Sequence, residues 1–257
     1  GSGMDPGSAL LRSLSGMTRE ARETPAETII RAHHRNRMQT FLRDATQFLP
    51  LLLQGIKFTV IVALGSLALS TLLGLVWALM RVSGIGWLAT TAKIVVNTLR
   101  GIPILVQLFY IYFVLPEFGI ALTALQAAII GLGIAYSAYQ SENFRAGIEA
   151  IDHGQIEAAQ SIGMGWGLTM RRVILPQAIR LVLPPYGNIM VMMLKDSSQA
   201  STITVAELTL QGTLIASSTF KNMTVYTLVA LLYLAMCLPL MGLVSWLERR
   251  FGKGARR

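Results

Sequence analysis

The sequence predicts an all-α integral membrane protein with about five transmembrane helices. Of the 257 residues, 53% are hydrophobic and only 14% are charged, whereas about a quarter of a soluble domain is charged. The apolar residues form long uninterrupted runs, and basic residues stand beside the ends of these runs. The net charge of +9 therefore indicates membrane orientation and does not indicate nucleic-acid binding.

The chain divides by composition into a polar start, an apolar body and a basic end. Residues 1–49 carry seven arginines; we expect their first part to be disordered and Pro25–Phe48 to form a basic amphipathic helix, a solvated tail being the alternative. Residues 50–250 form the predicted transmembrane domain. Residues 251–257 form a basic tail that we expect in the cytoplasm.

The first and last predicted spans are the most apolar segments of the sequence. Leu51–Met80 contains an uncharged core, Phe58–Met80, of 23 residues, and about 20 residues are needed to cross a bilayer. Thr224–Leu247 is the last predicted span, and the segment "ERRFGKGARR" closes it.

Three further spans are predicted between these two. The second, Ile94–Leu115, is interrupted by Arg100, Gly101 and Pro103. It crosses only if the helix begins near Thr91 and Arg100 reaches the membrane surface or forms a pair. The third and fourth are Ala121–Phe144 and Pro176–Leu194. The segment Thr202–Ala216 is expected to continue the fourth helix or to form a short re-entrant element.

The basic residues orient these spans. Arginines and lysines are concentrated in the loops at 81–93 and 145–175 and at the C-terminus, which predicts that all three are cytoplasmic. With five spans the N-terminal tail falls on the outer side despite its seven arginines. Either the tail is too long for the rule to apply or one crossing is miscounted.

The loop at 145–175 is patterned. Its segment "GQIEAAQSIG" predicts a short helix between Gly154 and Gly163, with Ile156, Ala159 and Ile162 on one side. We expect Glu157 in the first turn, where the helix dipole favours a carboxylate. A small, flat apolar face bounded by glycines suits docking into a groove on a cytoplasmic partner; a plain connecting loop is the alternative.

The spacing of this loop carries a resemblance to a known family. Glu157-Ala158-Ala159, Gly163 and Leu175-Pro176 stand as in the EAA loop of ATP-binding-cassette (ABC) importer permeases, although Val173 replaces the preferred isoleucine. The segments "NTLRGIPILVQLFYIYFVLP", "AYQSENFRAGIEAI" and "LPPYGNIMVMMLKDSS" are similar to the polar amino-acid branch of this family, which includes histidine, arginine, glutamine and glutamate importers. The resemblance covers most of residues 50–250 and excludes 1–49.

The resemblance implies the fold and the partners of the chain. It implies a type I ABC importer permease in the bacterial inner membrane, with a cytoplasmic coupling helix between the third and fourth spans. The implied partners are a cytoplasmic ATPase dimer, a second permease copy or a paralogue, and an extracytoplasmic binding protein that delivers an amino acid. The implied ATPase-coupling residues are Glu157, Ala158, Ala159, Gly163, Leu175 and Pro176.

The chain is not expected to be an enzyme. It contains no G-x-x-x-x-G-K-[ST] motif for nucleotide phosphates, so ATP and Mg²⁺ are expected in the partner ATPase and no cofactor is expected on this chain. A lone cysteine, Cys237, cannot form a disulfide within the chain.

Polar residues inside apolar segments are candidates for a substrate pathway, because a charge in the membrane is costly. Asp196, Ser197 and Ser198 end the fourth span, after two prolines that loosen the helix; an acidic side chain suits an amino-acid ammonium group. Gln140 and Glu142 lie in the third span. The alternatives are an ion pair of Asp196 with a basic residue and a helical pair of Glu142 with Arg145.

Two other functions are compatible with the spans alone. A stand-alone secondary transporter or channel could couple through Asp196 and Glu142, but the sequence shows few membrane acids and no inverted repeat. A membrane anchor without a transport role leaves the patterned loop unexplained.

Overall fold

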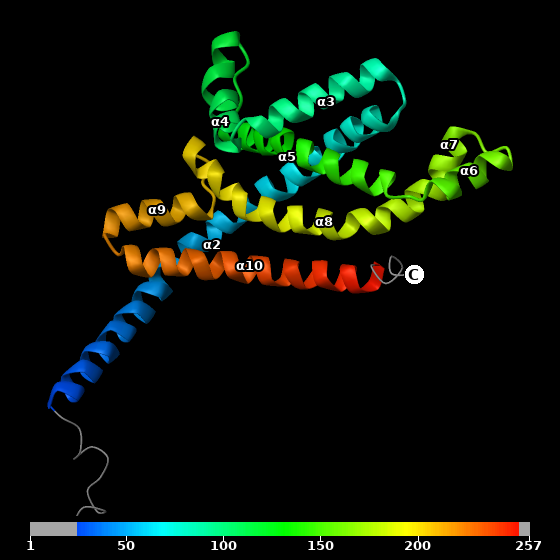
Figure 1. The fold of residues 1–257 in the computed structure, drawn as a ribbon. Helices are drawn as coiled ribbons and strands as arrows, with labels where there is room; N and C mark the ends of the chain where they lie inside the picture. Colours follow the sequence, from blue (N-terminus) through cyan, green and yellow to red (C-terminus); the bar gives the residue numbers. More distant parts are fainter. Residues whose placement is uncertain (1–24, 252–257) are drawn as a thin grey trace, which may run out of the picture. The chain divides into compact units, whose positions relative to one another are not determined.

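The computed structural model describes residues 25–251, with side chains described for 38–250, and the described part is helical without a strand (Figure 1). The chain divides into two units, residues 1–48 and 49–257. Helix α2 contributes to both units, and both candidate sites lie in the second. The helices are α2 (Pro25–Val82), α3 (Gly86–Gly101), α4 (Ile104–Phe109), α5 (Ala124–Glu149), α6 (His153–Ser161), α7 (Trp166–Thr169), α8 (Leu175–Asp196), α9 (Leu208–Thr219) and α10 (Asn222–Phe251).

The two most apolar predicted spans lie within long helices. The part of α2 from Met38 to Val82 has 45 residues and α10 has 29 residues up to Arg250, and both are apolar enough to cross a membrane. The predicted disordered start falls on residues 1–24, outside the described residues, and so does most of the basic tail at 251–257. Helix α2 runs without a break through the predicted boundary at 49/50.

The second predicted span is not one straight helix. The chain bends by 100° between α3 and the helical segment Ile104–Phe118. Pro103 has no N–H to donate and disfavours a helical Ile102, which is extended with φ −101° and ψ 130°. The Gln107 amide spans this break by donating to the carbonyls of Leu99 at 2.8 Å and Ile102 at 2.9 Å. If the bent pair counts as one span, the described residues contain three spans by length and composition.

Helices α5 and α8 correspond to the third and fourth predicted spans. With 26 and 22 residues, they are about 39 and 33 Å long, but they are not among the helices apolar enough to count as spans. The predicted number of five is therefore not confirmed. Thr123 and Gln126 cap the start of α5 reciprocally, and α8 continues through Pro184 and Pro185.

The segment Thr202–Ala216 does not continue the fourth helix. After α8 the chain forms a 3₁₀ turn, Ser197–Ile203, and reverses at Thr204, whose φ is +67°. A separate helix, α9, then begins after Glu207. This reversal separates the polar end of α8 from the last apolar helix.

The core lies around α5. Helix α5 packs against α3, α4 and α8, and α8 packs against α10. A Cβ on Gly74 of α2 would lie 2.7 Å from the Cβ of Gln140, so only glycine allows α2 and α5 to approach this closely. Val82, at the end of α2, packs on the loop that contains α6; we call this end of the helices the loop end.

Candidate functional site

The loop between α5 and α8 contains the predicted short helix. Helix α6 begins at His153, and the Asp152 carboxylate accepts a hydrogen bond of 2.7 Å from the Gly154 N–H. Glu157 is the fifth residue of the helix, so the prediction that it stands in the first turn is wrong. Asp152 takes that place because an N-cap acid satisfies free N–H groups at the helix start.

The two faces of α6 differ from the predicted flat apolar face. Ala159 is buried, and Ile156 packs onto a cluster that includes Ile148 of α5, Ile174 of the turn before α8, and Ala178 of α8. These side chains hold α6 to its own chain and do not face outward. Glu157 and Ala158 are exposed, and they form the outer surface of the helix.

The loop reverses at Gly163. Its φ of +80° is left-handed, a conformation that side chains other than glycine adopt at a cost, and nothing lies within 4 Å of where its Cβ would be. On either side of this turn, the side chains of Ile162 and Trp166 are 78% and 58% exposed. The turn therefore presents an apolar edge next to the outer surface of α6.

The returning segment enters α8 at the predicted place. Leu175 is the first residue of α8 and Pro176 the second. A π-helical turn, Met170–Ile174, joins α7 to α8 directly before them, so the backbone is helical from Trp166 onward. The Gln177 amide donates to the Gln155 side chain at 2.6 Å. This bond ties the start of α8 back to α6, so the loop is held at both ends.

The acidic end of α8 contacts α5. The Tyr136 hydroxyl donates a hydrogen bond of 2.6 Å to the Asp196 carboxylate. Asp196 is partly buried, Ser197 is buried with its hydroxyl on the Leu194 carbonyl at 2.7 Å, and Ser198 is partly buried. The partner of Asp196 is thus a tyrosine hydroxyl, and the described residues give no ion pair to this carboxylate.

Gln140 lies one helical turn beyond Tyr136 on α5. Its side chain is fully buried, and neither amide atom has a hydrogen-bond partner among the described residues. Three other buried polar atoms also have no hydrogen-bond partner among the described residues: the Ser141 hydroxyl, the Asn143 amide nitrogen and the Trp77 indole nitrogen. Buried polar atoms normally find partners, so this layer between α2 and α5 is unusual.

Glu142 joins three helices at the loop end. Its carboxylate accepts bonds from Arg81 of α2 at 2.5 Å, Arg100 of α3 at 3.3 Å and Arg145 of α5 at 2.8 Å. The helical pair with Arg145 was an expected alternative; the bonds to Arg81 and Arg100 were not predicted. Arg100 also lies over the Tyr139 ring, 5.7 Å from its centroid. Glu142 therefore ties α2, α3 and α5 together.

Sequence reasoning missed Glu207. Its fully buried carboxylate accepts hydrogen bonds of 2.9 Å from the N–H groups of Thr209 and Leu210 and of 2.8 Å from the Tyr233 hydroxyl. The Thr59 hydroxyl of α2 lies at 3.4 Å. An acid directly before an apolar segment is a sequence signal for a helix N-cap, and Glu207 caps α9 in this way. Its other partners, Thr59 of α2 and Tyr233 of α10, are far away in the sequence and could not be inferred. Among the described residues, no group of three or more His, Cys, Asp or Glu is placed to hold a metal ion.

These features define a helical integral membrane protein with a loop of two short helices, the first of them capped by Asp152, and a layer of buried polar side chains. The chain belongs to the family of binding-protein-dependent transport system inner membrane components, which matches residues 70–253. The predicted fold class, an all-α permease of the ABC importer type, is thereby confirmed.

Individual relatives extend this assignment. The chain is 40% identical over 193 residues to "Probable amino-acid ABC transporter permease protein YckA" of Bacillus subtilis, covering 75% of this chain and 85% of that protein. It is 38% identical to "Probable glutamine ABC transporter permease protein GlnM" of the same organism, covering 78% and 93% of the two chains.

Solved structures agree with the fold. A chain in the "Crystal structure of an amino acid ABC transporter with histidines" is 40% identical, with a TM-score of 0.76 over 80% of this chain and 97% of that one. A chain of the MetNI methionine ABC transporter, 20% identical with a TM-score of 0.68 over 79% and 97% of the two chains, shows the same fold.

Proposed function

We propose that this chain carries a polar amino acid across the bacterial inner membrane and couples to a cytoplasmic ATPase through α6. Membership of the inner membrane component family supports the transport role, and the amino-acid permeases among its relatives support the substrate class. The geometry of the loop between α5 and α8 is the main support for the coupling role. Asp152 and Gly163 fix the two ends of α6 while Glu157 and Ala158 remain exposed.

The geometry of this loop suggests different roles for its exposed and its packed residues. The exposed face of α6 and the apolar edge at Ile162 and Trp166 suit docking into a groove on a partner. In this proposal Glu157, Ala158 and Gly163 contact or shape that interface. The buried Ala159 and the partly buried Leu175, which packs on the same cluster as Ile156, act from inside by holding α6 to the returning chain. Pro176 is exposed and acts through the backbone at the start of α8.

The partners are proposed from the same reasoning. ATP and Mg²⁺ bind to the ATPase dimer and not to this chain. A second permease, identical or paralogous, completes the pathway, and an extracytoplasmic binding protein supplies the amino acid. The loop end of the helices then lies in the cytoplasm, as the basic residues of the loops predict.

The substrate pathway is proposed to run beside the junction of α5 and α8. Asp196 offers a carboxylate for an ammonium group, and its hydrogen bond to Tyr136 fixes its position. Ser197 and Ser198 continue the polar segment, and Gln140 supplies an amide that has no protein partner. Glu142 is bonded to three arginines, so we propose that it closes the loop end and does not contact the amino acid.

The coupling proposal is tested by Gly163→Asp and Glu157→Lys. The permease is reconstituted with an ABC ATPase and an amino-acid binding protein from the same organism that co-purify with it. Hydrolysis stimulated by amino acid and binding protein is then measured. Both variants are expected to lose stimulated hydrolysis while still inserting in the membrane. Gly84→Asp is the matched control, because Gly84 also has a positive φ, of +75°, and open space around it; it lies outside the loop between α5 and α8.

The control separates coupling from backbone strain. If Gly84→Asp and Gly163→Asp lose hydrolysis equally, strain alone explains the loss. If both loop variants retain full stimulation, α6 does not carry the coupling. Uptake by Asp196→Asn at limiting amino acid tests the pathway separately, and unchanged uptake would reject Asp196 as a contact.

A further inference from the structure

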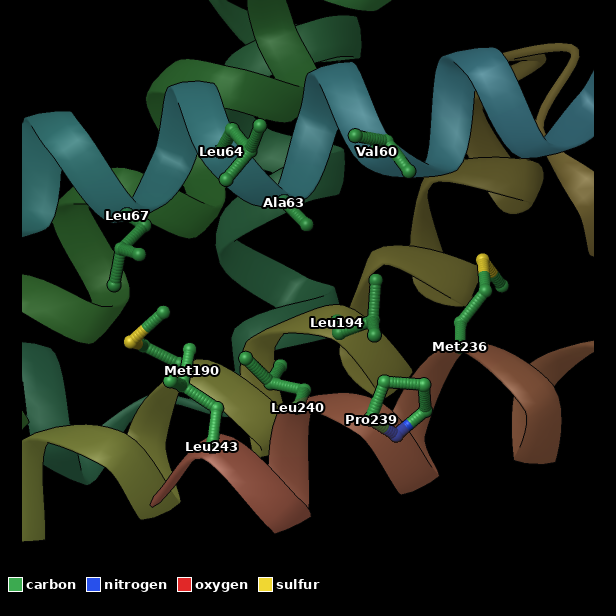
Figure 2. Close-up of a pocket in the computed structure, with 10 residues that line it drawn as sticks. All are labelled: Val60, Ala63, Leu64, Leu67, Met190, Leu194, Met236, Pro239, Leu240 and Leu243. Carbon is green, nitrogen blue, oxygen red and sulfur yellow. The ribbon is translucent and has the colours of Figure 1, made fainter. Parts of the chain in front are cut away.

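A cavity of about 410 Å³ opens on the side of the helices, between α2, α8 and α10 (Figure 2). Apolar side chains from all three helices line it and point into it: Val60 and Leu67 from α2, Met190 and Leu194 from α8, and Pro239 and Leu243 from α10. Its size is within the range of small-molecule sites, about 300–1,000 Å³. We call it the lateral cavity. A wall without polar side chains offers nothing to the substrate of a polar amino-acid permease, so this cavity is distinct from the proposed pathway.

The depth of the lateral cavity matches half of a bilayer. Pro239 lies near the middle of α10, and Trp246, Arg249 and Arg250 lie near its end. The ten residues from Pro239 to Arg249 rise by about 15 Å, and half of a hydrocarbon core is also about 15 Å. Tryptophan and arginine at a helix end are typical of the membrane–water interface. The cavity therefore lies at the depth reached by the end of one lipid acyl chain.

Basic side chains lie at the end of α10, about two turns beyond Leu243 of the cavity wall. The Arg249 Nε–H donates a hydrogen bond of 3.2 Å to the Ser245 carbonyl. Arg249 and Arg250 are exposed, and Arg250 lies over the Trp246 ring, 5.4 Å from its centroid. A Cβ on Gly187 would lie 2.6 Å from the Val244 side chain, so α8 passes close to α10 here.

The start of α8 adds a third base at this end. Val191 and Leu194 pack with Cys237 while Gly187 meets Val244, so α8 runs antiparallel to α10. The exposed Arg180 consequently lies on the same side as the end of α10. Glu248 is the one acidic residue in the last turn of the described part of α10, so the three arginines outweigh it.

We propose that the lateral cavity binds one acyl chain of an anionic phospholipid, whose phosphate is held by Arg249 and Arg250. The flexible side chains of Met190 and Met236 can adapt to a chain of irregular shape. Leu64 and Leu243 line the cavity and are exposed, so a lipid can enter sideways from the bilayer. Basic residues at this depth attract anionic head groups, whereas an apolar protein partner has no need of them.

Native mass spectrometry of the full chain in mild detergent, titrated with phosphatidylglycerol or phosphatidylcholine, tests the proposal. One phosphatidylglycerol is expected to remain bound at lower concentration than phosphatidylcholine. Ala63→Leu places a larger side chain in the cavity, and Ala230→Leu makes the same change on an exposed position of α10. Only the first is expected to weaken phosphatidylglycerol binding.

The head-group contact is tested by a second pair of variants. Arg249→Gln with Arg250→Gln is expected to weaken phosphatidylglycerol binding by about tenfold or more, because each base near the membrane surface contributes to anionic lipid binding. Arg171→Gln with Arg172→Gln, two exposed arginines of the loop, is the matched control.

The outcomes separate a lipid from other occupants. If Ala63→Leu fails to fold, the variant with Arg249→Gln and Arg250→Gln tests the proposal by itself. Both arginine side chains are exposed, so their replacement is expected to leave folding intact. Equal retention of the two lipids by the unaltered chain overturns the proposal, as does equal binding by the arginine variant and its control. If Ala63→Leu changes the number of associated permease copies and leaves lipid binding unchanged, the cavity is an interface between copies and the proposal is wrong.

Discussion

Glu142→Gln is expected to destabilise the protein by about 2 kcal/mol. The Glu142 side chain is 24% exposed, and Arg81, its nearest partner, is 15% exposed. Removing one member of a buried ion pair costs about 3–5 kcal/mol because the other charge is left without compensation. Solvent screens a partly exposed pair, so the expected cost is reduced to about 2 kcal/mol, although Arg81 and Arg100 lose this acceptor and Arg145 retains only Glu149.

The assay is thermal unfolding of the purified permease in detergent. A loss of about 2 kcal/mol corresponds to a decrease in Tm of about 4–8 °C for a domain of this size. Glu149→Gln is the matched control, because the Glu149 side chain is 51% exposed and pairs with Arg145 alone. An exposed helical pair contributes about 0.3–0.5 kcal/mol, so the control is expected to shift Tm by about 1 °C.

A double variant identifies the partner. Adding Arg81→Gln to Glu142→Gln removes the most buried of the uncompensated charges, and part of the lost Tm should return. Equal shifts for Glu142→Gln and Glu149→Gln would refute the reasoning, since burial and the number of partners would then have no effect. A double variant less stable than the sum of its two single changes would refute the role of Arg81.

Three further changes test other contacts of the second unit. Glu207→Ala should lower stability by about 3 kcal/mol, because the N–H groups of Thr209 and Leu210 and the Tyr233 hydroxyl lose a buried acceptor; thermal unfolding measures it, and an unchanged Tm would contradict it. Gly74→Val should cost about 1–3 kcal/mol because its Cβ would meet Gln140, and Gly86→Val, which has open space, should cost clearly less in the same assay. Tyr136→Phe should reduce uptake at limiting amino acid by freeing Asp196, whereas Tyr139→Phe, which lies outside this hydrogen bond, should retain uptake; equal uptake by the two would remove Tyr136 from the pathway.

Most of the fold could be predicted from the long apolar runs and from the spacing of residues in the loop between α5 and α8. Phe58–Met80 and Thr224–Leu247 are long and uncharged, so their helices follow from length and hydropathy alone. Asp152 and Gly163 act through their own backbone neighbourhood, and a local effect of this kind can be read from a short stretch of sequence. The predicted start of α6 at Gly154 differs from the observed one at His153, because the Asp152 carboxylate caps the helix.

The errors arose where distant residues or backbone geometry decide the structure. Pro103 signalled an interruption, but the sequence could not state that the chain would turn by 100°. The partners of Glu207 come from α2 and α10, which are 148 residues and 26 residues away in the chain. Side chains with such partners carry no local pattern, so only the packing of the helices identifies them.

The polar layer beside Gln140 connects the two candidate sites. Helix α5 ends at Glu149, and only Ala150, Ile151 and Asp152 separate it from the start of α6. In the proposed coupling, a displacement of α6 by a docked partner would reach α5 through these three residues. The first ionic contact on its way is that of Glu149 with Arg145, and Arg145 also binds Glu142. Gln140 and Ser141 lie in the same turn as Glu142, and their buried polar atoms have no described partners. Because unpaired polar atoms gain hydrogen bonds when water enters, this layer favours separation of α2 and α5 while the arginines on Glu142 oppose it.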